Sequence, residues 1–121
     1  MRAALQVHGP LSRGALAVAV LVSFAVLFAP ADEVPFAPPG VDKVVHCALF
    51  AALALTGRWA GIGRRVLAVL LITYAAVSEV LQGMTALNRT ASVADWLADV
   101  VGVLLGLAVW ELLDRRRRVA G

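Results

Sequence analysis

Two carboxylates stand four residues apart near the start of a long apolar segment. Asp95 and Asp99 precede an almost uninterrupted apolar run that continues to Trp110. A spacing of four places both side chains on one face of a helix. Acidic side chains in a membrane-spanning helix are rare and usually functional, because an ionised group in the bilayer is costly. These two residues are therefore the first candidates for a functional site.

Three more candidates open an earlier apolar segment. Asp42, Lys43 and His46 lie within one and a half helical turns of each other. His46 follows Asp42 by four residues, so we expect a hydrogen bond from Asp42 to orient the imidazole. Asp42 is equally well explained as the N-cap of its helix.

A third polar group interrupts another apolar segment, where Glu79 and Gln82 are three residues apart. We expect Glu79 to reach the same depth as Asp99 and to share a proton with it, because two adjacent buried carboxylates do not both ionise readily. An alternative is that Glu79 pairs with Arg89 and fixes a loop. Ser92 and Asp95 also match a capping box. A capping box would give both residues a structural role at the start of the helix, but it does not account for Asp99.

These residue types also include metal ligands. His46, Glu79, Asp95 and Asp99 are acceptable donors, but their spacing matches no specific metal signature. The sequence therefore predicts neither a metal site nor a cofactor. Catalytic residues are not identified beyond the candidates His46, Glu79 and Asp99.

The composition indicates an integral membrane protein. Of 121 residues, 61% are hydrophobic and 16% are charged, against about 45–50% and about 25% in soluble domains. The basic residues lie at the ends of apolar segments, which is typical of membrane topology and not of nucleic-acid binding. The lipid bilayer is the partner that this composition predicts.

The order of apolar segments predicts an all-α fold, a polytopic bundle of four transmembrane helices forming a single domain over residues 1–121. The helices are expected at about residues 14–30, 42–57, 65–85 and 92–113. With four alternating spans, nine arginines fall on one face and only Lys43 and Arg89 on the other. By the positive-inside rule both termini are cytoplasmic, and the candidate residues meet in a pocket open to the exterior.

Two features allow more than one interpretation. Residues 14–29 also resemble the apolar part of a signal peptide, and Ala29-Pro30-Ala31 resembles its cleavage site. Gly102 and Gly106 form a Gly-x-x-x-Gly pair that packs against other helices or supports an oligomer.

The polar residues together resemble the VanZ-like family of small bacterial membrane proteins, over about residues 41–106. The resemblance rests on three motifs in order, which carry Asp42, Lys43 and His46, then Glu79 and Gln82, then Arg89, Ser92, Asp95 and Asp99. It implies a site formed by these nine residues in the bacterial plasma membrane. The family's prototype is associated with resistance to the glycopeptide antibiotic teicoplanin. The segment from Cys47 to Phe50 departs from the family, where relatives often have a tyrosine.

Three functions are compatible with these residues. The leading hypothesis is binding or modification of an amphiphile at the outer membrane face. The amphiphile would be a lipid-linked cell-wall precursor or a lipoglycopeptide, and Lys43 and Arg89 would contact its anionic group. The second is a membrane hydrolase or transferase in which His46 or Glu79 is the general base. The third is a proton-coupled transporter, which the lack of ionisable residues in the inner half disfavours.

Overall fold

Four helices make up the part of the chain that the computed structural model describes, which is residues 9–28, 40–84 and 93–120. They are α1 (Pro10–Leu27), α2 (Val41–Trp59), α3 (Arg64–Met84) and α4 (Val93–Ala120). No strand occurs among the described residues. The all-helical fold and the order of the four helices are as predicted.

The helix ends differ from the prediction at two places. α1 begins at Pro10 instead of about residue 14, because proline is well suited to the first position of a helix, where its missing N–H is not needed. α4 continues past residue 113 through the arginines to Ala120. Arginine is a good helix former, and Arg118 pairs with Asp114 one turn earlier at 2.9 Å.

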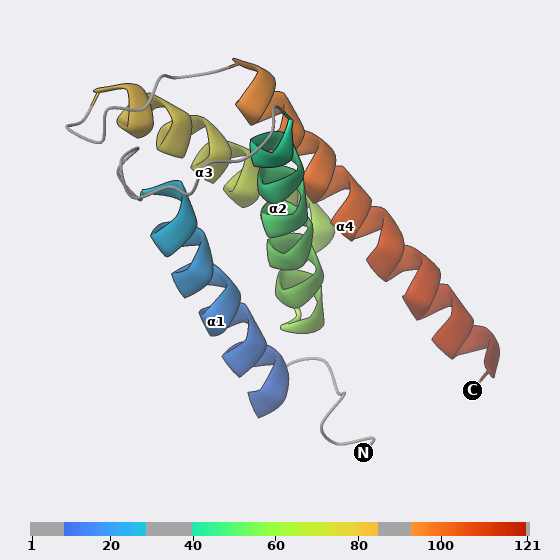
Figure 1. Ribbon diagram of the computed structural model, residues 1–121. Coiled ribbons are helices and arrows are strands. Elements are labelled where there is room, and N and C mark those ends of the chain that lie inside the picture. The colour runs from blue at the N-terminus through green and yellow to red at the C-terminus, as the bar shows by residue number, and fades with distance from the viewer. Residues whose placement is uncertain (1–8, 29–39, 85–92, 121) are drawn as a thin grey trace.

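The helices alternate in direction, so α1 begins at the end of the bundle where α4 finishes (Figure 1). α2 and α4 run in the same direction and share the most extensive interface, while α1 packs on α2 and α3 packs on α4 and, more lightly, on α2. The end where α2 and α4 begin and α3 finishes is called the site end. The opposite end, which carries most of the arginines, is called the basic end.

Small residues allow α2 and α4 to approach closely. A Cβ atom on Gly106 would lie 2.6 Å from the carbonyl oxygen of Ala51, and one on Gly102 would overlap the carbonyl of Cys47. Both glycines are thus used within the chain, on the side that faces α2. This packing lies within one chain and does not require an oligomer.

Ionic contacts hold the same two helices at the basic end. Arg58 of α2 donates to Glu111 of α4 at 3.4 Å, and Arg64 of α3 lies 3.9 Å from the same carboxylate. The Arg58–Glu111 pair is 53 residues apart, the same separation as a second α2–α4 contact at the site end, between His46 and Asp99. A constant separation is the signature of two parallel helices in fixed register.

The bundle has an apolar core, but it also buries ionisable groups and exposes many apolar side chains. His46, Glu79 and Asp99 are buried, together with three serines, while valines and leucines on all four helices are exposed. A protein surrounded by lipid shows this arrangement, because lipid solvates apolar side chains and does not solvate charges. Within the described residues, two helices are long and apolar enough to cross a membrane, Pro10–Leu27 and Val93–Val119.

Replacing Gly106 with alanine is expected to lower thermal stability in detergent, because the new methyl group would meet the backbone of α2. The expected loss is about 1–3 kcal/mol, the usual range for inserting a methyl group into a closely packed interface. Gly14→Ala in α1 is the control, since a Cβ there has open space within 4 Å. Thermal melting followed by size-exclusion chromatography measures both variants, and equal melting temperatures would contradict the α2–α4 packing.

Candidate functional site

A buried histidine and a buried aspartate join α2 to α4 at the site end. Nδ1 of His46 and Oδ1 of Asp99 are hydrogen-bonded at 2.7 Å, with side-chain exposures of 2% and 0%. An ionised carboxylate only accepts, so with Asp99 ionised Nδ1–H is the donor and the neutral imidazole has its lone pair on Nε2. The contact therefore fixes both the tautomer and the orientation of the ring.

A second ionic contact lies one turn closer to the site end. Nζ of Lys43 donates to Oδ1 of Asp95 at 2.8 Å, and the two side chains are 43% and 15% exposed. The pair is 52 residues apart, one fewer than the His46–Asp99 pair, and it joins the same two helices. It differs in environment, because Lys43 remains partly accessible whereas His46 does not.

Glu79 of α3 lies close to the His46–Asp99 pair. One ligand-type atom from each of His46, Glu79 and Asp99 lies within 4.8 Å of the other two, and Glu79 is only 5% exposed. At about 1.5 Å per residue, each lies about 7–9 Å along its helix from the site end. We call these three residues the buried cluster.

The structure adds a partner that the sequence did not predict. Nδ1 of His46 is bonded to Asp99 of α4, while the predicted contact with Asp42 lies outside the described side chains and stays a prediction. Helical spacing identifies which residues share a face of one helix, and it carries no information on which face a neighbouring helix covers. The buried pair forms because α4 presents Asp99 directly to that face of α2.

The accessibility of the cluster also differs from the prediction. A pocket open to the exterior was expected, but each of the three side chains is at least 95% buried among the described residues. Four other predicted site residues are not described at side-chain level: Asp42 and Gln82 lie in helices whose side chains at these positions are not placed, and Arg89 and Ser92 fall outside the described residues.

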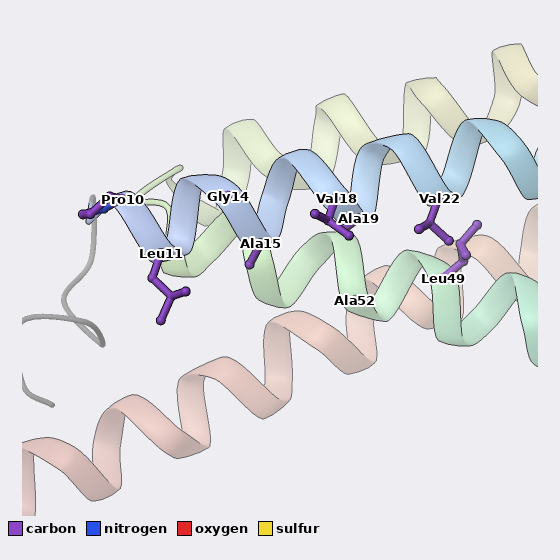
Figure 2. Close-up of a pocket in the computed structure, with 9 residues that line it drawn as sticks. All are labelled: Pro10, Leu11, Gly14, Ala15, Val18, Ala19, Val22, Leu49 and Ala52. Carbon is purple, nitrogen blue, oxygen red and sulfur yellow. The ribbon is translucent and has the colours of Figure 1, made fainter.

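An apolar groove runs along the outside of α1 and α2 (Figure 2). Its volume is about 660 Å³, and small residues such as Gly14, Ala15 and Ala52 give it depth. Leu49, at one end of the groove, is three residues from His46 on α2. The groove therefore reaches within one helical turn of the buried cluster without containing a polar side chain.

One polar contact was not predicted from the sequence. The hydroxyls of Ser23 in α1 and Tyr74 in α3 are hydrogen-bonded at 2.9 Å, and Tyr74 packs on Phe24 and Phe50. Tyr74 therefore combines aromatic packing with a hydrogen bond between α1 and α3. The serine within an apolar helix was the signal that it has a polar partner elsewhere in the bundle.

Similarity to a known protein family extends over most of the chain. The model of the VanZ/LLP1 family matches residues 10–114. The chain belongs to the VanZ/LLP1 family. The match covers all of α2 and α3 and, unlike the motif region at residues 41–106, also takes in α1. No curated protein and no solved structure matches the chain significantly.

Proposed function

We propose that this VanZ/LLP1 protein binds the anionic head group of an amphiphile at the outer face of the bacterial plasma membrane. The observation that carries the proposal is the partly exposed Lys43, which lies beside the buried cluster of His46, Glu79 and Asp99 at the site end. Ionisable groups gathered from three helices are expensive to keep in a membrane protein unless they serve a ligand or a reaction.

The proposal includes four transmembrane spans with both termini in the cytoplasm. Supporting it, α2 and α3 expose valines to the surroundings just as α1 and α4 do. The three charged residues of α2 lie at its two ends, and in α3 only Glu79 is distant from an end. The basic end then lies in the cytoplasm and the site end outside, in agreement with the positive-inside rule.

The topology is tested by cysteine labelling in intact cells. In a Cys47→Ser background, a cysteine replacing Gly121 is expected to resist a membrane-impermeant maleimide, and one replacing Ala91 is expected to react. The reason is that Gly121 follows the basic end and Ala91 precedes the site end. Permeabilised cells, in which both positions should react, are the control. Labelling of Gly121→Cys in intact cells would contradict the orientation.

Lys43 is the described residue best suited to meet the head group. Its ammonium is 43% exposed and lies 2.8 Å from Asp95, so a phosphate or carboxylate of a ligand competes with a carboxylate already present. The ammonium remains paired when one anion replaces the other. Arg89, if it lies in the outer loop as proposed, adds a second cation.

The apolar groove is the seat that we assign to the acyl chain of the same amphiphile. It has no polar lining side chain, and it ends at Leu49, one turn from His46. Along α1 it extends from Pro10 to Val22, about 18 Å at 1.5 Å per residue. This length suits an extended hydrocarbon chain.

The family resemblance suggests the class of amphiphile. The prototype's association with teicoplanin resistance leads us to propose a lipoglycopeptide or the lipid-linked cell-wall precursor that such antibiotics bind. Both combine anionic or polar head groups with a hydrocarbon chain. A binding protein of this kind would alter how much antibiotic reaches its target.

A hydrolase or transferase is the second candidate, favoured by the His46–Asp99 contact. A carboxylate that accepts from Nδ1 leaves Nε2 able to accept a proton, as a general base requires. Purified protein that releases product from a lipid-linked substrate over many turnovers would favour the enzyme. A stoichiometric shift of the ligand without product would favour binding.

Antibiotic susceptibility tests the function in cells. In a teicoplanin-susceptible bacterium, expression of the wild-type protein is expected to raise the minimum inhibitory concentration several-fold. Asp99→Asn and Glu79→Gln are expected to abolish the increase, because each removes a charge from the buried cluster.

Glu111→Gln is the matched control, since it removes a carboxylate at the basic end. Expression of every variant is compared by immunoblot of membranes. Resistance that survives both cluster substitutions at normal expression would exclude a role for the cluster.

A further inference from the structure

The buried cluster has the composition of a metal site. It contains one imidazole and two carboxylates, contributed by α2, α3 and α4, and three ligand-type atoms lie within 4.8 Å of one another. Three protein ligands with nitrogen and oxygen donors are typical of catalytic zinc sites, which keep one position for water or a ligand. We propose that His46, Glu79 and Asp99 bind a divalent transition-metal ion, with Zn²⁺ as the ion that fits this donor set.

A second observation points to a ligand in the same place. Oδ1 of Asp99 accepts from His46, but Oδ2 is buried and has no hydrogen-bond partner. A buried acceptor without a donor is expensive, at about 1–3 kcal/mol and more for a charged group. Since Asp99 is 0% exposed, bulk water does not solvate this oxygen. A cation beside Oδ2 supplies the missing positive partner.

The charges balance with a divalent ion. A neutral His46 with ionised Glu79 and Asp99 gives two negative charges, which one divalent cation cancels. Neutrality matters because an uncompensated charge in a low-dielectric interior is very costly. The imidazole selects for a transition metal, because Mg²⁺ and Ca²⁺ prefer oxygen ligands alone.

The distances require only local adjustment. Three ligand atoms at about 2.1 Å from a tetrahedral Zn²⁺ lie about 3.4 Å apart. The ligand-type atoms already lie within 4.8 Å of one another, and the 2.7 Å hydrogen bond between His46 and Asp99 would open as both side chains turn toward the ion. No metal signature is visible in the sequence, because the three ligands come from three helices and have no characteristic spacing along the chain.

The site is tested by metal content. The full-length protein, purified in detergent and treated with a chelator, is incubated with ZnCl₂, desalted and analysed by mass spectrometry for zinc. We expect about one Zn²⁺ per chain in the wild type. We expect loss of most of it in His46→Ala, Glu79→Gln and Asp99→Asn. Asp95→Asn, Glu111→Gln and Cys47→Ser are expected to retain it, the last excluding the single thiol as the ligand.

Two further measurements address variants that fail to fold. Co²⁺ in place of Zn²⁺ should give the visible absorption bands of a four- or five-coordinate site in the wild type, and added Zn²⁺ should raise the wild-type melting temperature. A wild-type protein with neither zinc, cobalt bands nor a shift in melting temperature would overturn the proposal. Zinc held equally by the cluster variants and the controls would overturn it as well. The proposed binding of an amphiphile is tested separately, by the antibiotic susceptibility of cells that express the protein.

Discussion

The contact between His46 and Asp99 places two ionisable side chains 2.7 Å apart in a region with almost no solvent exposure. Neither group is stable alone in such surroundings, because a buried charge or an unmatched polar atom carries a penalty of several kcal/mol. Each therefore depends on the other, and their helices must stay in the register that joins them. This dependence constrains the register of α2 and α4.

The rest of the bundle is consistent with that constraint. Gly102 and Gly106 let the backbones of α2 and α4 approach, and Arg58 and Glu111 repeat the same register at the basic end. α3 then brings Glu79 to the two helices from a third side. A site built from buried ionic groups thus rests on a closely packed pair of parallel helices.

Much of this could be predicted from the sequence, and the missing part has a clear physical cause. Helical spacing and segment order gave the four helices, the similar depth of Glu79 and Asp99, and the family. They did not give the partner of His46, because rotation of one helix relative to another depends on packing between distant segments. The ends of α1 and α4 were also misplaced, since Pro10 and the final arginines are compatible with a helix that hydropathy alone would end earlier.

The most direct measurement of the central contact is the nitrogen-15 spectrum of the His46 ring in metal-free protein. The chain has two histidines, so His8→Gln leaves one imidazole to observe. We predict a strongly hydrogen-bonded Nδ1–H, protected from exchange with water, which changes in Asp99→Asn and is unaffected by Glu111→Gln. A His46 ring that exchanges freely with water and does not respond to Asp99→Asn would contradict the account.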